Sequence, residues 1–370
     1  MRTLFDVYGL TWFKTSAILM YMNTILGLTC ISEELKDIDK KKYSFQTMTR
    51  KRFNDLCNKE DRNEAIRQLS ERILHNCCVT SAILHHCFKS DIGHYRLSSN
   101  LCPLVTDETL EIDFEELPDI EAIKQEFRHI GILAKTLNIS IGSHPDQFCV
   151  LASLNQDAVR RTIIELNFQA KIFDMIGLPR DHTAPMNIHV NASPTPIVGA
   201  EMMITPEQIH KLKVKQLAER FYENLQKCDK GVRNRLTIEN EDKSFFNVDN
   251  CLQFSEYLFD KYQYNLPVVH DNLHDNCNPS EEKNIIRNAE RCAYTWVNQG
   301  EGDNNFISPV FHWSFGKPEK PRAHADYAPP HNSYPPVIAI DPNYPAKFEI
   351  ELKLKDKAIR LLKQQVEQAI

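Results

Sequence analysis

The sequence predicts an α/β fold, a single-domain (β/α)8 barrel with a metal site at the C-terminal ends of its strands. Short apolar runs alternate with segments of helical periodicity, as the strands and helices of such a barrel do. Five of the runs end on a histidine or a carboxylate, about 30 to 50 residues apart. Because catalytic side chains of this fold project from the C-terminal strand ends onto one face, these residues suit a cluster of divalent metals. They are His144, His189, Glu239, Asp271 and His312.

The first half of the chain supplies three expected strands, each an apolar run bounded by helical spacing. An adjacent histidine pair, His85 and His86, falls inside a helix, and we expect it to pack or to face solvent rather than to bind metal. The expected strands are 24–31, 94–99 and 139–145, and the helices are 62–88, within a helical stretch that begins at Ser44, and 120–137.

The second half continues the alternation to the end of the chain. Gly177 is a usual helix stop and ends the first helix of this half. The last strand is expected at 347–353, with 337–341 as a competing candidate, and a final helix runs to the C-terminus. The other expected strands are 186–192, 235–241, 266–271 and 308–314, and the helices are 157–177, 205–228, 249–262 and 280–298.

No domain boundary is evident in the 370 residues. The Pro-rich stretch 316–345 is the best linker candidate, but ligand-type residues lie on both sides of it, so we interpret it as a long loop over an active site. Met22 is a possible true start. We therefore assign residues 22–370 to the barrel and residues 1–21 to an N-terminal extension of unknown role.

The composition is that of an ordinary globular protein, with 42% hydrophobic and 25% charged residues. A net charge of −6 argues only weakly against a DNA partner, because metal-binding carboxylates inflate the negative count. Eleven cysteines without a CxxC pair indicate reduced thiols and an intracellular, reducing compartment. The uncharged run 15–31 is too short and polar for a transmembrane helix and lacks a signal-peptide cleavage pattern.

Two further histidines join the strand-end residues as candidate ligands. His274 follows Asp271 by three residues, and His324 follows His312 in the long loop. Each residue taken singly has an ordinary alternative: Asp271 could cap a helix, Glu239 could belong to a polar loop, and either loop histidine could be hydrogen-bonded. Their joint arrival at strand ends favours a metal cluster, with Glu239 as a bridging ligand. His270 should face the other way and be structural.

The last strand carries charges on one face. Glu349, Glu351 and Lys353 alternate, so all three share a side of the strand. If that side faces the barrel, Glu351 is a metal ligand and Lys353 is a partner for phosphate or base; otherwise this is a solvated edge. We predict Glu239, Asp271, Glu351 and Lys353 as catalytic. No P-loop, GxGxxG or GxSxG motif occurs, so we expect no nucleotide cofactor.

Taken together, the motifs resemble the UV damage endonuclease family over residues 24–355. The resemblance implies a (β/α)8 barrel with two or three divalent ions, Mn²⁺ before Mg²⁺ or Zn²⁺, that nicks duplex DNA 5′ of ultraviolet photoproducts in DNA repair. The partner would be damaged double-stranded DNA, on which the chain would act as a monomer. The motifs are YRLSSNLCP, IGSHPDQF, NIHV, IENED, PVVHDNLH, FHWS, HADY and IELKLKD.

The family's functional positions carry over residue by residue. Gln147 and Phe148 fall where the family inserts side chains opposite a flipped-out lesion, and an amide and an aromatic ring can fill such a gap. Asn100, in the YRLSSNLCP motif, is expected to contact DNA. The positions that match metal ligands are His144, His189, Glu239, Asp271, His274, His312, His324 and Glu351.

Four positions depart from the family pattern. Val310 stands where a modified lysine is usual, so one metal position could be differently ligated, weak or absent. Asp107 replaces a metal-site histidine and could still bind a hard cation. Leu28 replaces a tyrosine and Asp146 a glycine, which could alter the grip on the lesion.

The resemblance implies metal-assisted phosphodiester hydrolysis, with specificity from the ease of bending and unstacking damaged DNA. Three alternatives stay open. They are an abasic-site endonuclease of similar barrel type, a metal-dependent sugar isomerase, and a damage-binding barrel that has lost catalysis with the lysine at Val310.

Overall fold

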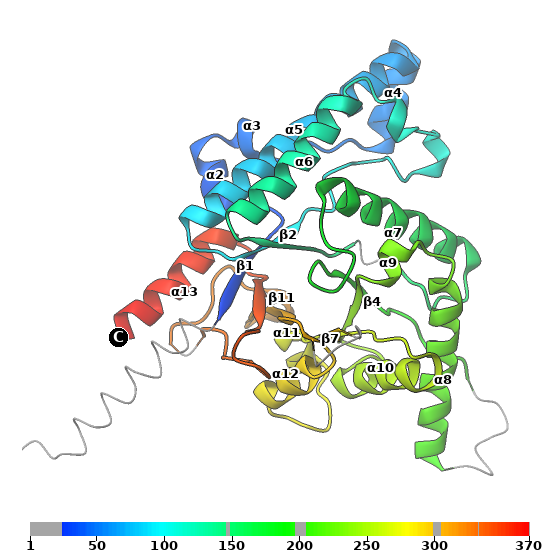
Figure 1. Cartoon of the computed structure of the whole chain (residues 1–370), viewed down its shortest axis with the longest axis vertical. Helices are drawn as coiled ribbons and strands as arrows, with labels where there is room; N and C mark the ends of the chain where they lie inside the picture. The colour runs from blue at the N-terminus through cyan, green and yellow to red at the C-terminus, as the bar shows by residue number, and fades with distance from the viewer. Residues whose placement is uncertain (1–23, 146–148, 197–204, 299–304, 332, 370) are drawn as a thin grey trace, which may run out of the picture.

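Eight parallel strands form a nearly closed barrel with helices around it (Figure 1). The computed structural model describes residues 24–145, 149–196, 205–298, 305–331 and 333–369, so the predicted extension at 1–21 lies outside the described residues. The strand order is β6-β5-β4-β3-β2-β1-β12-β9, as a (β/α)8 barrel requires. The barrel strands are β1 (Ile25–Thr29), β2 (His94–Leu97), β3 (Ser140–Ser143), β4 (Met186–His189), β5 (Leu236–Glu239), β6 (Val268–Val269), β9 (Val310–Trp313) and β12 (Lys347–Ile350).

The barrel closes where two predicted site residues meet. β6 and β9 are the ends of the sheet, and a single parallel bridge joins Asp271 to His312. The backbone N–H of His312 donates to the carbonyl of His270 at 3.0 Å. The closing seam therefore lies at the C-terminal end of both strands.

The helices pack around the outside of the strands. Several begin at a side-chain cap; Thr205, for example, forms a capping box with Gln208 at the start of α8. The helices that follow barrel strands or precede them are α2 (Glu33–Ile38), α3 (Lys40–Tyr43), α4 (Arg50–Lys59), α5 (Arg62–Lys89), α6 (Ile120–Thr136), α7 (Gln156–Ile176), α8 (Pro206–Leu225), α9 (Lys230–Arg233), α10 (Val248–Tyr262), α11 (Asn272–Cys277), α12 (Ile285–Ala293) and α13 (Lys355–Ala369), with two short 3-10 helices at Glu108–Leu110 and Phe114–Glu116.

Strand alternation separates the core from the site. In the last two barrel strands, Phe311 and Phe348 lie 6.0 Å apart between ring centroids, and Trp313 lies 5.8 Å from Phe348. These residues fill the layer between sheet and helices. The alternate residues, His312 and Glu349, consequently face the barrel interior.

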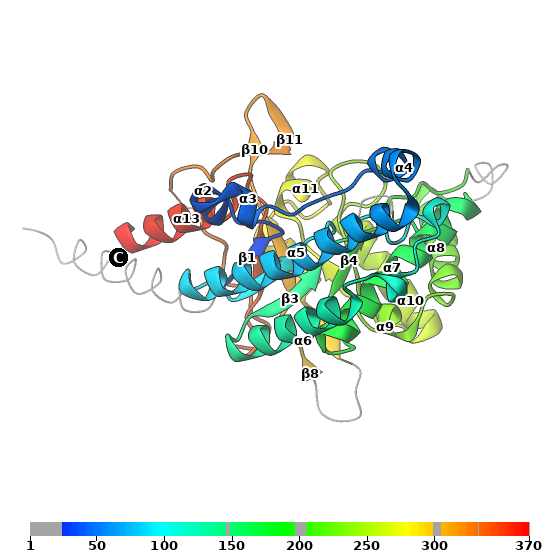
Figure 2. The same ribbon diagram turned by 90° about the horizontal axis from the view of Figure 1, so that it is seen from above.

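Two predictions about the second half of the chain need correction. The helix expected at 280–298 is only α12, because Asn284 caps its start with bonds from two backbone N–H groups and residues after it pair as β7 (Val297–Asn298) with β8 (Asn305–Phe306). The expected loop 316–345 contains a hairpin of β10 (Gly316–Lys317) and β11 (Lys320–His324), which projects from the barrel in Figure 2. Residues 337–341 form no strand, so the last strand is the one expected at 347.

All eleven cysteines of the sequence lie among the described residues, and each is a free thiol. In the part of the chain that the structure describes, no helix combines the length and apolar character needed to cross a membrane.

Candidate metal centre

The predicted ligands gather at one end of the barrel because each lies at or just after a strand end. His189 and Glu239 are the last residues of β4 and β5, and His312 lies in β9. His144 and Glu351 directly follow β3 and β12. Parallel strands bring their carboxyl ends to the same face, so six strands contribute once Asp271, two residues after β6, is included.

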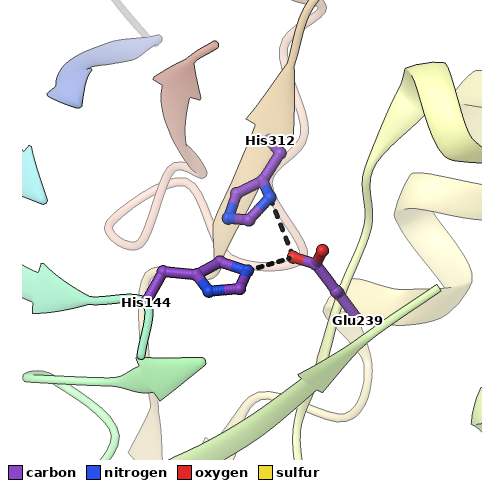
Figure 3. Close-up of side chains that lie close together, drawn as sticks. All are labelled: His144, Glu239 and His312. Carbon is purple, nitrogen blue, oxygen red and sulfur yellow. Dashed lines mark ion pairs between the residues drawn. The ribbon is translucent and has the colours of Figure 1, made fainter. Parts of the chain in front are cut away.

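Glu239 is the centre of the cluster. Its side chain is 1% exposed and faces four imidazoles, of which His274 is the most distant, with Nδ1 3.7 Å from Oε1. His189 Nε2 lies 2.8 Å from Oε1, while His312 Nδ1 and His144 Nε2 lie 2.9 Å and 3.4 Å from Oε2. Figure 3 shows the His144 and His312 rings converging on the same carboxylate oxygen. Asn187, also from β4, donates to Oε2 at 2.5 Å and holds the carboxylate in place.

A second carboxylate group adjoins the first. Asp271 Oδ2 lies 3.7 Å from both His312 Nδ1 and His274 Nδ1, and its Oδ1 accepts the backbone N–H of His274 at 2.8 Å. Glu351 Oε1 lies 3.7 Å from His312 Nδ1, and Glu351 Oε2 lies 3.5 Å from Nε2 of His324. His324 comes from the hairpin strand β11 and is the most exposed of these side chains, at 34%.

The donor set fits divalent cations. Two of its buried atoms, Asp271 Oδ2 and His312 Nδ1, have no hydrogen-bond partner among the described residues. Buried polar atoms are normally paired, and two polar atoms left without a hydrogen bond beside one another form an environment that a divalent cation would satisfy. Two sets of side chains have ligand atoms close enough to share an ion: His144, Glu239 and His312, and Asp271, His312 and Glu351.

The charged side chains of the site shift one another's pKa values. Burial acts against ionisation of Glu239, but His189, His312 and His144 hold the pKa of its carboxyl well below its usual range. Burial likewise opposes the charged form of His274, yet Asp271 and Glu239 raise its pKa to about 9. The Glu239 and Asp271 carboxylates therefore favour positive charge next to them, which a divalent cation would also supply.

Two residues of β2 that support the cluster, His94 and Arg96, were not anticipated from the sequence. Arg96 donates to Glu349 Oε2 at 2.9 Å and also to Glu351, and His94 contacts Glu349 Oε1 at 3.0 Å. Residue alternation could have found both, since His94 and Arg96 share one face of β2 as Glu349 and Glu351 share one face of β12.

Of the predicted site residues, one lies apart from the cluster and another is exposed to solvent. Asp107 caps a 3-10 helix, and its Oδ2 forms an ion pair with Arg50 at 2.6 Å instead of joining the imidazoles. Lys353 is exposed. Lys355, at the start of α13, is turned inward instead: its Nζ donates to the Thr29 hydroxyl at 2.9 Å, and burial followed by the nearby Arg96 lowers its pKa.

The expected DNA-contacting residues and substitutions fall in different places. Asn100 is exposed in the turn after β2, whereas Gln147, Phe148 and Asp146 lie outside the described residues. Leu28 and Val310 are buried, with Val310 paired to Lys347 of the neighbouring strand. His270 faces away from the cluster, as expected, and contacts Asp275 at 3.0 Å.

A third set of ligand-type side chains lies between α2, α5 and α13. His86 Nε2 is 3.0 Å from Asp356 Oδ2 and 3.5 Å from Glu34 Oε2. Asp356 is already engaged, because it accepts hydrogen bonds from Ser32 and from the backbone N–H of Glu33 at the start of α2. Asp356 thus serves as a cap of α2, with the imidazole of His86 beside it.

Comparison with known proteins identifies the family of the chain. The chain is 28% identical over 317 residues to a UV DNA damage endonuclease of Bacillus cereus, which covers 85% of this chain and 86% of that protein. It is 30% identical over 278 residues to the protein of the same name from Nostoc sp., covering 74% of this chain and 73% of that one. The crystal structure of SacUVDE superposes with a TM-score of 0.68 at 23% identity, covering 93% of this chain and 99% of that one. The model of the UV-endonuclease UvdE family matches residues 24–369, and the chain belongs to that family.

Proposed function

We propose that this chain is a metal-dependent endonuclease of DNA repair that nicks duplex DNA immediately 5′ of ultraviolet photoproducts. Membership of the UV-endonuclease family supports the reaction and the DNA substrate. The observation that carries the metal dependence is the Glu239 cluster, in which four imidazoles surround one buried carboxylate beside an Asp271 oxygen that has no hydrogen-bond partner among the described residues. We further propose that the chain acts as a monomer without a nucleotide cofactor.

Mn²⁺ is the proposed ion, because mixed imidazole and carboxylate ligands suit Mn²⁺, Zn²⁺ and Fe²⁺ better than Mg²⁺. Divalent ions at such a site supply a Lewis acid for the scissile phosphate and lower the pKa of a bound water toward neutrality. The proposed ligands are His144, His189, Glu239, Asp271, His274, His312, His324 and Glu351.

Side chains that do not bind the ions have separate proposed roles in orienting ligands and holding the DNA. Asn187 fixes the orientation of the Glu239 carboxylate through a hydrogen bond to Oε2. We propose Lys355, rather than Lys353, as the cation that faces the negative phosphate, because its side chain is turned inward against Thr29. We also propose that Gln147 and Phe148, which follow His144 in the sequence, fill the space left by the extruded lesion.

The test separates cutting from binding. Glu239→Gln keeps the size of the side chain but removes the charge on which the imidazoles converge. We expect cutting of a dimer-containing duplex to fall by about 100-fold or more, since disturbing even the supporting groups of a metal site costs 10- to 100-fold. Affinity for the same duplex should stay within about twofold. Both are measured with labelled DNA in Mn²⁺.

Glu219→Gln is the matched control, since Glu219 pairs with Lys261 on the outside of the barrel. It should cut like the wild-type chain. Unchanged cutting by the Glu239 variant would contradict the metal assignment, and equal loss of cutting and DNA affinity would indicate misfolding rather than lost catalysis.

A further inference from the structure

Glu349 is a fully buried carboxylate directly beside the proposed metal ligand His312. The two residues are register partners on adjacent strands, β12 and β9, and both face the barrel interior. Glu349 is only 2% exposed, and its Oε2 lies 3.2 Å from His312 Nε2.

The two nitrogens of the His312 ring face different groups. Nδ1 is directed at the cluster, 2.9 Å from Glu239 and 3.7 Å from both Asp271 and Glu351. Nε2 faces Glu349 on the opposite side of the ring. A histidine that binds a metal through one nitrogen is held in orientation by an acceptor at the other, and a carboxylate is the strongest such acceptor.

We propose that Glu349 is the positioning residue of the metal centre: it accepts the Nε2–H of His312 and thereby presents Nδ1 to the ion. The inference rests on the metal centre proposed above. It adds a residue that is not itself a ligand and that acts through His312.

Glu349 is itself held rigidly. Oε2 accepts a hydrogen bond from Arg96 at 2.9 Å, and Oε1 lies 3.0 Å from His94 Nε2. The other nitrogen of His94 contacts the Ser140 hydroxyl at 2.8 Å. A series of contacting side chains therefore links β3, β2 and β12 to the His312 ring on β9.

Burying a carboxylate in the barrel is costly unless every oxygen is paired. An apolar residue at this position would pack a barrel interior more simply, so the charged group is best explained by what it orients. Arg96 adds a second consequence, because it also bonds Glu351. Without Glu349 the arginine would act on Glu351 alone and compete with a cation for that carboxylate.

The experiment measures Mn²⁺ affinity of the full chain by electron paramagnetic resonance, with no DNA present. The variants are Glu349→Gln, which keeps an acceptor of the same length, and Glu349→Met, which removes it. We expect Glu349→Met to weaken Mn²⁺ binding about 10- to 100-fold and Glu349→Gln to weaken it less. Thermal unfolding of the metal-free proteins is followed in parallel.

Asp174→Asn is the matched control, because Asp174 forms an ion pair with the buried Arg235, which precedes β5 at the opposite end of the barrel. It should lower the unfolding temperature and leave Mn²⁺ affinity unchanged. A merely structural role for Glu349 predicts that the Met variant behaves in the same way, which would overturn the proposal.

A double-variant cycle tests the route through His312. If Glu349 acts by orienting that ring, Glu349→Met should cost no further affinity in a His312→Gln background. A further loss as large as in the wild-type background would overturn the proposal while leaving the metal centre intact. No Mn²⁺ binding by the wild-type chain would overturn the metal centre and this inference together.

Discussion

His182 is a buried histidine that stays neutral, and it makes the stability of the fold depend on pH. It precedes β4, at the end of the barrel opposite the metal ligands, and burial lowers its pKa from 6.5 to about 4. A depressed pKa means that the unfolded chain takes up a proton before the folded chain does. The stabilising effect is thus fully present above pH 6.5 and is lost as the pH falls toward 4.

We expect the wild-type chain to lose about 2 kcal/mol of unfolding free energy relative to His182→Gln between pH 7 and pH 5. Urea denaturation of both proteins at several pH values measures the difference. The comparison with the variant cancels the other titrating groups. A difference that does not change over this range would mean that His182 is solvated in the folded chain, and a change of the opposite sign would mean that the fold holds it charged.

Lys353 and Lys355 give a second test at the level of single residues. Lys355→Ala should reduce cutting about tenfold or more, because a cation aimed at a reacting phosphate stabilises its developing charge. Lys353→Ala should change cutting by less than about twofold, since that side chain is exposed. Single-turnover rates on a dimer-containing duplex measure both. The reverse order would restore Lys353 as the phosphate partner.

Five of the proposed ligands were accessible from the sequence because each ends an apolar run, as Glu239 does after LTI. The supporting groups were harder to find. Alternation places His94 and Arg96 on one face of their strand, but it does not show that the pairing of β2, β1 and β12 brings that face to Glu349 and Glu351. The sequence does not show which of Lys353 and Lys355 points into the barrel, because this depends on where α13 begins.

The β10–β11 hairpin carries His324 to the metal centre. Gly316 is the register partner of His324, and a Cβ at Gly316 would lie 2.1 Å from the backbone oxygen of Pro321. Gly316→Ala should therefore distort the hairpin and displace the imidazole. We expect it to weaken Mn²⁺ binding about tenfold, as His324→Ala should, with no further loss in the double variant. Calorimetric titration measures this, and additive losses would show that the hairpin acts by another route.

At the level of elements, the alternation of strands and helices followed from hydrophobic periodicity alone. The helix expected at 280–298 came out shorter at both ends. Residues 280–284 are polar and end in the cap Asn284, and the residues after Ala293 lead into the two-residue strand β7, which is too short to show a period-2 pattern. The hairpin was missed because its strands are polar and half-exposed, so they carry no alternating apolar signal.

At the scale of the whole molecule, the metal centre lies across the seam that closes the barrel. Asp271 and His312 form the bridge between β6 and β9, and both are proposed ligands. Bound ions should therefore stabilise the closed barrel. We expect Mn²⁺ at 100 times its dissociation constant to add about 2.7 kcal/mol to the unfolding free energy, and EDTA to remove this gain. Thermal unfolding checks it, and Glu239→Gln should show a much smaller shift. An equal shift in that variant would place the ions elsewhere.

The most direct test of the central claim is incision of an end-labelled duplex that carries one thymine dimer, in Mn²⁺ or EDTA, beside undamaged and abasic duplexes. We predict metal-dependent cutting immediately 5′ of the dimer and none of the undamaged duplex. Cutting of the abasic duplex alone would make the chain an abasic-site endonuclease. Binding of the dimer duplex without any cutting would contradict the proposed activity and indicate a barrel that recognises damage but has lost its chemistry.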